Sequence, residues 1–136
     1  MKPEPNHARA IRSRLAHIDR TLTLIERIAI EGERGVIHET TPLPPEQARD
    51  VAAAVAEARR RIESLRHVLG LARDVLPGEQ AIGGLCAFLW EAVVETHAKY
   101  LDGYGRVPDE LRDILDPAVD ELEGILDRVH DAARRR

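Results

Sequence analysis

The chain has 136 residues, of which 43% are apolar and 32% are charged, and its formal net charge is −4 at pH 7. This length suits one domain with a sizeable core, and the acidic balance argues against a nucleic-acid binder that works by neutralising phosphates. The single cysteine excludes an internal disulfide, so nothing in the sequence requires an oxidising compartment.

The sequence also argues against a membrane location. The first ten residues lack the apolar centre of a signal peptide. The most apolar run, residues 81–94, contains Glu91 and is too short to cross a hydrocarbon layer about 30 Å thick. We therefore expect a cytoplasmic protein that contacts neither membranes nor nucleic acids.

The first expected helix covers about residues 7–31, with Asn6 as its cap and Gly32 at its end. Its apolar residues recur at steps of four and three, the spacing of one helix face: Ile11, Leu15, Ile18, Leu22, Ile25 and Ala29. The prolines of residues 35–45 exclude a regular helix there. We expect the apolar side chains of that segment to fold back over the end of the helices; they are Val36, Ile37 and Leu43.

The second expected helix covers about residues 45–75 and begins at prolines, which the first turn of a helix tolerates. Its apolar row consists of Ala48, Val51, Val55, Ala58, Ile62, Leu65, Leu69 and Ala72. Arg59, Arg66 and Arg73 flank this row, and acids flank the row of the first helix at Asp19, Glu26 and Glu33. In an antiparallel pair such flanks face each other, so we expect surface ion pairs between the two helices.

The third expected helix, about residues 79–102, carries most of the aromatic residues. One row at steps of four and three is Ile82, Cys86, Leu89, Val93, Thr96 and Tyr100, and a second row is Trp90, Val94, His97, Leu101 and Tyr104. Two adjacent apolar rows need two neighbouring helices, so we expect Trp90 and Tyr100 in the core. A further strip points away from this core and predicts a second interface; it consists of Leu85, Phe88 and Ala92.

The fourth expected helix covers about residues 108–134 and begins at Pro108, which is followed by two acids. Pro117 removes a backbone hydrogen bond and clashes with the preceding turn. We expect either a kink or a fresh helix start with Asp116 as the cap.

Four long amphipathic helices with short connections predict an all-α fold. The expected architecture is an antiparallel, up-down-up-down four-helix bundle that forms a single domain over residues 1–136.

His97 is the residue with the most chemical potential, because it lies on the broad apolar face of the third helix. We hypothesise that it donates a hydrogen bond to Asp116, and that a ligand site would lie around Trp90, His97, Tyr100 and Asp116. No metal-binding motif is present, and Cys86 is expected to be a buried apolar residue. We expect no catalytic residues, no metal and no cofactor.

The sequence does not identify a function. The preferred hypothesis is a non-catalytic helical bundle that acts by binding protein, first as a homodimer through the strip around Phe88. The alternative is a small-ligand-binding or catalytic bundle with a site around Trp90, His97 and Tyr100. The absence of any enzyme motif favours the first.

Overall fold

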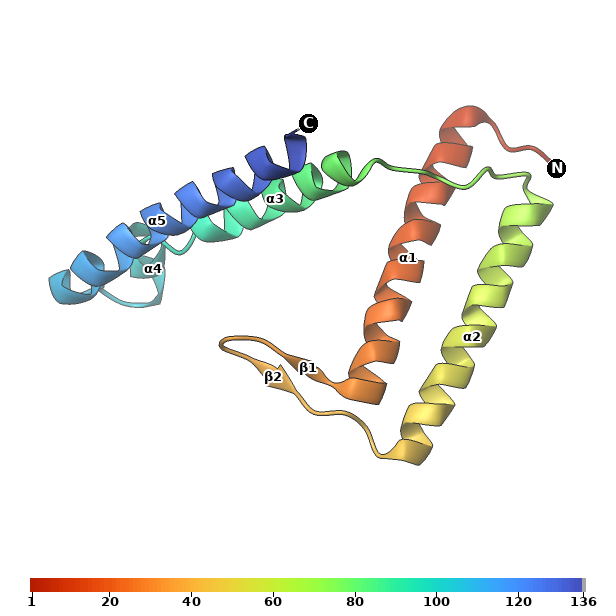
Figure 1. Ribbon diagram of the computed structural model, residues 1–136, viewed down its shortest axis with the longest axis horizontal. Coiled ribbons are helices and arrows are strands. Elements are labelled where there is room, and N and C mark those ends of the chain that lie inside the picture. Colours follow the sequence, from red (N-terminus) through yellow and green to blue (C-terminus); the bar gives the residue numbers. More distant parts are fainter. Residues whose placement is uncertain (136) are drawn as a thin grey trace. The chain divides into compact units, whose positions relative to one another are not determined.

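The computed structural model describes residues 1–135. Within them the chain is predominantly α-helical, as predicted, with one short two-stranded sheet. The contacts divide the chain into two compact units, Met1–Asp74 and a second that begins at Val75. Figure 1 shows a pair of long helices in each unit. The single four-helix-bundle domain over residues 1–136 stays a prediction, and residue 136 lies outside the described residues.

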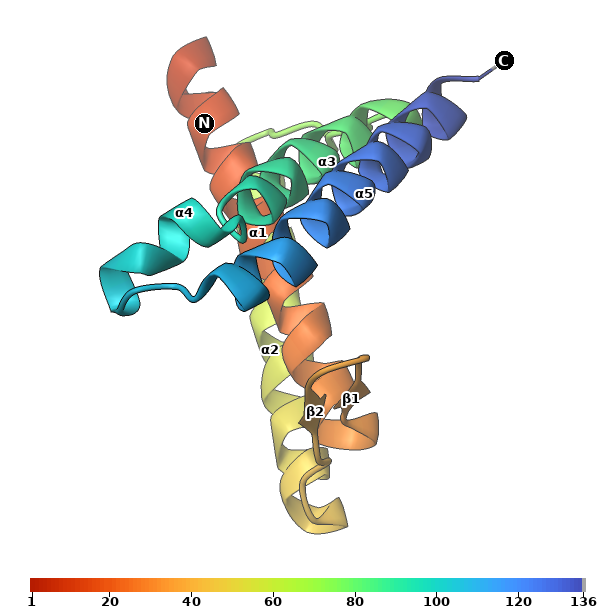
Figure 2. The ribbon, with the colours of Figure 1, turned by 90° about the vertical axis from the view of Figure 1, so that its left-hand side faces the viewer.

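The first unit is a helical hairpin formed by α1 (Pro5–Glu31) and α2 (Pro45–Val68). The two helices are joined through β1 (Glu33–Arg34) and β2 (Glu39–Thr40), which pair antiparallel with Glu33 opposite Thr40. Figure 2 shows these strands at the end of the α1–α2 pair. The buried apolar residues of this unit are small or medium-sized: Ala29, Ala48, Val55 and Leu71.

The predicted ion pairing between the first two helices is present around Arg59 of α2. Its Nε donates to Asp19 Oδ1 at 3.2 Å and its Nη2 to Thr23 Oγ1 at 2.7 Å, both on α1. Its Nη1 lies 3.8 Å from Glu26 Oε2. Arg66 instead pairs within its own helix with Glu63, at 2.6 Å between Nη2 and Oε1. The cross-helix contacts confirm that α1 and α2 are antiparallel neighbours.

The predicted end of the second helix at residue 75 is wrong, because the helix stops at Val68. Gly70 has φ +62°, a conformation that glycine adopts without steric cost. The Gly70 amide donates to the His67 carbonyl at 3.1 Å, and the Leu71 amide donates to the Arg66 carbonyl at 2.9 Å. These are the two bonds of a Schellman cap. The glycine therefore ends the helix before it reaches Leu69 and Ala72, the last two residues of the predicted apolar row.

In the connection between α1 and α2, Leu43 returns to the end of α1, where its amide donates to the Ala29 carbonyl at 3.0 Å. Val36 and Ile37 do not fold back over the helices as predicted. Val36 and Ile37 are fully exposed, at 108% and 98%, in the turn between β1 and β2. The Gly35 amide donates to the His38 carbonyl at 2.8 Å, and the Glu33 amide donates to Thr40 Oγ1 at 2.9 Å. These hydrogen bonds form a hairpin that carries the two side chains into solvent.

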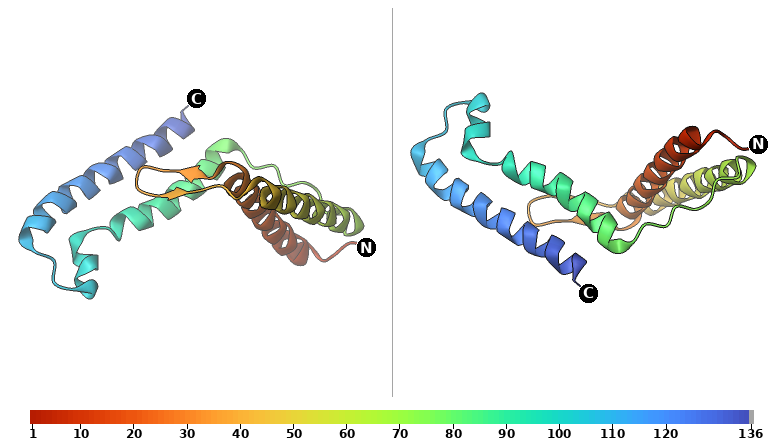
Figure 3. Two further views of the ribbon diagram at one scale, coloured as in Figure 1. Left: turned by 90° about the horizontal axis from the view of Figure 1, so that it is seen from below. Right: turned by 90° about the horizontal axis from the view of Figure 1, so that it is seen from above.

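The second unit contains α3 (Gly78–Val94), α4 (Ala98–Leu101), the 3-10 helix η1 (Asp102–Tyr104) and α5 (Asp109–Arg134). Figure 3 shows α3 and α5 side by side, with α4 near one end of the pair. The buried apolar residues of the second unit are Cys86, Ala98, Val107, Val119 and Leu126. Near the other end, a Cβ added to Gly83 would lie 3.3 Å from His130 Nε2, so α3 and α5 approach closely there.

The predicted helix 79–102 is interrupted after Val94. Thr96 Oγ1 donates to the Ala92 carbonyl at 2.9 Å, and His97 Nδ1 donates to the Val94 carbonyl at 2.9 Å. These side chains thus donate to carbonyls at the end of α3 in addition to the backbone amides of Thr96 and His97. The Ala98 amide, at the start of α4, donates to Asp116 Oδ1 on α5 at 2.8 Å. The break therefore depends on a tertiary contact.

The predicted restart at Pro117 does not occur, because α5 continues through it from Asp109 to Arg134. Pro117 cannot donate to the Asp113 carbonyl one turn earlier. Both residues are solvent-exposed, so water is available to that carbonyl. Asp116 caps α4 rather than a new segment of its own helix.

The prediction that Trp90 and Tyr100 lie in the core is wrong for the described structure, where they are 50% and 47% exposed. Cys86 of the same predicted face is buried, as expected. In a two-helix unit α3 has one helical neighbour of similar length, α5, so only one of its apolar rows is covered.

Candidate functional site

The candidate site is centred on His97, at the break between α3 and α4. Its position is fixed on both sides. The preceding turn closes through hydrogen bonds to Val94, and the following residue, Ala98, is fully buried and bonded to Asp116 of α5. The backbone on both sides of His97 is therefore fixed, and this holds the imidazole against α5.

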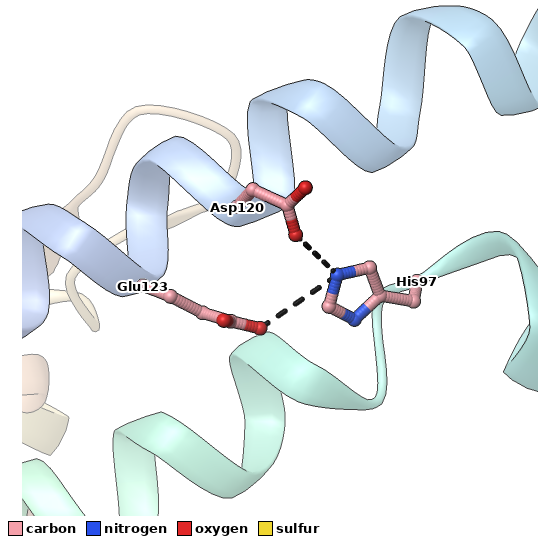
Figure 4. Close-up of side chains that lie close together, drawn as sticks. All are labelled: His97, Asp120 and Glu123. Atoms are coloured by element: carbon pink, nitrogen blue, oxygen red, sulfur yellow. Dashed lines mark hydrogen bonds and ion pairs between the residues drawn. The ribbon is translucent and has the colours of Figure 1, made fainter.

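Two carboxylates of α5 face the same ring nitrogen of His97. Asp120 Oδ1 lies 2.9 Å from Nε2, and Glu123 Oε1 lies 3.7 Å from it. Asp120 and Glu123 are three positions apart, so they lie on the same face of the helix. Figure 4 shows the imidazole with Nε2 turned toward both side chains. His97 and Glu123 are partly buried, whereas Asp120 is exposed.

The other ring nitrogen is already satisfied. A carbonyl oxygen only accepts, so the 2.9 Å contact between His97 Nδ1 and Val94 requires a proton on Nδ1. In the neutral ring this leaves the lone pair on Nε2, directed at Asp120. A lone pair facing a carboxylate is repulsive, so the arrangement needs a positive species at Nε2: a proton or a bound cation.

The same contacts raise the pKa of His97 above its ordinary value. The hydrogen bond to Asp120 is the largest cause, followed by the bond to the Val94 carbonyl, while partial burial acts in the opposite direction. Glu123 adds a favourable electrostatic interaction with the charged ring. The site thus favours the protonated imidazole more than water does, and the protonated ring can form an ion pair that links the chain break to α5.

His97, Asp120 and Glu123 also have the composition of a metal site. One ligand atom from each lies within 4.8 Å of the other two. A histidine nitrogen with two carboxylate oxygens is a set that Zn²⁺ accepts.

The structure does not join the predicted site residues into one site. The hydrogen-bond partner of His97 on α5 is Asp120, not Asp116 as hypothesised. Asp116 instead accepts from the Ala98 amide. Tyr100 is exposed, with Lys99 Nζ 5.1 Å from the centre of its ring. Trp90 lines an open hollow on the α3–α5 pair with Cys86, Leu126 and His130.

Asp120 and Glu123 are the two site residues that were not predicted from the sequence. The predicted partner, Asp116, lies one helical turn before Asp120, because the predicted third helix continues to residue 102 without a break. The break before Ala98 changes the course of the chain, and residues 98 and 116 become partners. The available signal was the run of acids on one side of the fourth helix at Asp116, Asp120 and Glu123.

The strip predicted as an interface is exposed. Phe88 is 76% exposed, Leu85 is also exposed, and Ala92 accompanies them on α3. Among the described residues, no helix combines the length and the hydropathy needed to cross a membrane.

Comparison of the chain with protein-family models, with curated proteins and with solved structures gave no match.

Proposed function

We propose that the protein is a non-catalytic helical-bundle protein that acts through protein–protein contacts, first with a second copy of itself. The observation that carries this proposal is an exposed apolar face on the α3–α5 hairpin. The face consists of Ile82, Leu85, Phe88, Leu89 and Ala92 on α3 with Leu111, Ile114, Ala118, Leu122, Ile125 and Val129 on α5.

Helical geometry supports treating these residues as one surface. On α3 they lie to one side of buried Cys86, and on α5 they lie to the same side of buried Val119 and Leu126 when each helix is viewed from its amino end. Because the helices are antiparallel, equal displacement places both rows on the same face of the hairpin. The opposite edge carries acids, among them Glu91 and Asp120. A contiguous apolar surface of this kind is typical of an interaction site.

The first unit has a smaller surface of the same kind. Ile18 and Ile25 on α1 and Leu65 and Val68 on α2 are exposed beside the buried row of that hairpin. An amphipathic helical hairpin gains stability by burying such a face against other helices. The proposal therefore includes the up-down-up-down bundle of the four long helices, in which the apolar faces of the two hairpins cover each other.

The strip of Leu85, Phe88 and Ala92 is assigned to a second copy of the chain. These residues lie farther round α3 from buried Cys86 than Leu89 does, so they remain at the margin of a bundle. The strip itself contains no charged residue, and this chemistry fits another apolar strip better than a charged partner. A two-fold axis through Phe88 would bring the same strip from two copies together.

The test is the molar mass in solution, measured by size-exclusion chromatography with light scattering at micromolar concentration. The wild-type protein is expected to elute as a dimer, and Phe88→Glu is expected to elute as a monomer because it places a charge in the apolar contact. Tyr104→Glu is the matched control, since Tyr104 is a 92% exposed aromatic residue outside the strip. A monomeric wild type, or a dimer that persists in Phe88→Glu, contradicts the proposed interface.

A further inference from the structure

We propose that His97, Asp120 and Glu123 form a binding site for one Zn²⁺ ion. His97 supplies Nε2 from the break between α3 and α4, and the two acids supply carboxylate oxygens from adjacent turns of α5. The site lies on the acidic side of the α3–α5 hairpin, away from its apolar face, and is independent of the proposed self-association.

The spacing of the ligand atoms fits a small tetrahedral ion. Zinc–nitrogen and zinc–oxygen bonds of about 2.0–2.2 Å place neighbouring tetrahedral ligands about 3.4 Å apart. The distances from His97 Nε2 to Asp120 Oδ1 and Glu123 Oε1 are 2.9 and 3.7 Å, on either side of that value. The oxygens of Asp120 and Glu123 lie within 4.8 Å of each other, so all three ligand atoms are near enough to surround one ion after side-chain rotation.

The hydrogen bond at Nδ1 prepares the histidine for a metal. Metal-binding histidines commonly donate their second N–H to a carbonyl or a carboxylate, which fixes the tautomer and the ring orientation. His97 Nδ1 donates to the Val94 carbonyl at 2.9 Å, so in the neutral ring the lone pair is on Nε2 and faces the acids. This contact does not involve Asp120 or Glu123. It is a separate observation that orients His97 as a metal ligand.

The charges also balance. Two carboxylates and a neutral imidazole carry −2 in total, equal and opposite to the charge of the ion. Neither Asp120 nor Glu123 has an arginine or lysine partner among the described ion pairs, so a cation meets no internal competitor there except the proton on His97.

The ligand types select among metals. The nitrogen ligand favours Zn²⁺ over Mg²⁺ and Ca²⁺, which prefer all-oxygen sites. Three protein ligands leave a fourth tetrahedral position for water. Asp120 is exposed, so this position is accessible to solvent.

The test is calorimetric titration of the full-length, chelator-treated protein with Zn²⁺ at neutral pH, with Mg²⁺ as the comparison ion. We expect one Zn²⁺ per chain and no Mg²⁺ binding. His97→Gln, Asp120→Asn and Glu123→Gln should each weaken Zn²⁺ binding by at least about tenfold, since even the loss of an outer hydrogen-bond partner has an effect of that size. Glu121→Gln is the matched control, because Glu121 lies on α5 between the two ligands but outside the cluster.

Two further readouts keep the result decisive. Circular dichroism shows whether each variant is folded, and Co²⁺ in place of Zn²⁺ gives a visible absorption band whose intensity reports tetrahedral coordination. The band should be present in the wild type and in Glu121→Gln and lost in His97→Gln. Absence of Zn²⁺ binding, or equal affinity in folded His97→Gln, overturns the proposal.

Discussion

At the scale of single residues, Asp116 of α5 determines the geometry of the break between α3 and α4. Its carboxylate accepts from the Ala98 amide at 2.8 Å and so satisfies the first turn of α4 from a different helix. This contact holds Ala98 in a fully buried position and thereby places His97 next to Asp120. The geometry of the candidate site thus depends on a residue outside it.

Replacing Asp116 with alanine should therefore destabilise the second unit by about 1–2 kcal/mol, the usual effect of losing a capping carboxylate. The measurement is urea unfolding, combined with hydrogen exchange at the Ala98 amide, which should become faster. Asp116→Asn retains an acceptor and should restore most of the protection. Asp113→Ala, at an exposed position one turn earlier in α5, serves as the control; an equal loss of stability in both alanine variants would contradict a specific role for Asp116.

The ion pair between Glu63 and Arg66 should make the stability of the protein depend on pH. The Glu63 side chain receives hydrogen bonds from Arg66 Nε at 2.9 Å and Nη2 at 2.6 Å, and these bonds lower the pKa of Glu63 below its ordinary value of 4.5. A group with a lowered folded-state pKa stabilises the fold above its unfolded pKa, and this contribution is lost as the pH falls through the folded-state pKa. The Glu63–Arg66 pair thus stabilises the carboxyl end of α2 at neutral pH but not in strong acid.

The comparison of wild type with Glu63→Gln isolates this effect. The wild type should have the higher urea midpoint at every pH well above 4.5, and the two midpoints should converge as the solution is acidified below that value. The difference should be small, because the pair is on the surface. A difference that stays constant into strong acid would show that ionisation of Glu63 is not its source.

At the scale of elements, glycines that look alike in the sequence have opposite roles. Gly70 has φ +62° and ends α2, and an added Cβ there meets Lys2 Cγ only at an ordinary 3.7 Å. Gly124 lies inside α5, where an added Cβ meets no atom within 4 Å. The cost of a side chain at Gly70 is therefore conformational, whereas alanine at Gly124 is free of both strain and collision.

We expect Gly70→Ala to lower the free energy of unfolding by about 1 kcal/mol, because alanine is strained in the left-handed conformation. Gly124→Ala should raise it by about 0.5–1 kcal/mol through helix propensity. Urea unfolding of the two variants beside the wild type measures both changes. A gain of stability in Gly70→Ala would contradict the left-handed conformation at Gly70, and a loss in Gly124→Ala would contradict the open helical position of Gly124.

Features that depend on local sequence could be predicted, whereas features that depend on tertiary contacts could not. The four- and three-residue spacing placed the long helices, and the charge pattern predicted ion pairs between the first two helices, of which Arg59 with Asp19 is one. These are properties of one helix face and can be read locally. The break after Val94 could not be read in this way, because no glycine or proline marks it and its first amide is satisfied by Asp116 of α5. The partner of His97 was misassigned for that reason.

At the scale of the whole molecule, the long helices carry more apolar side chains than each helical hairpin buries. Cys86 is buried between α3 and α5, while Leu89, three positions later, is 53% exposed. The sequence pattern predicts a residue's preference for burial but does not identify the partner that covers it. The burial predicted for Trp90 and Tyr100 failed within the α3–α5 unit for this reason.

We propose that other helices cover the apolar faces of the two hairpins in solution, and the accessibility of a thiol placed on such a face measures this coverage. Single cysteines are introduced as Leu122→Cys, on the apolar face of α5, and as Tyr104→Cys, at a 92% exposed site outside it; buried Cys86 is a slow internal reference. The rate of reaction with a thiol reagent is then measured under native conditions. We expect the cysteine at position 122 to react much more slowly than the one at position 104, and equal rates in a folded protein would show that the apolar face of α5 is not covered.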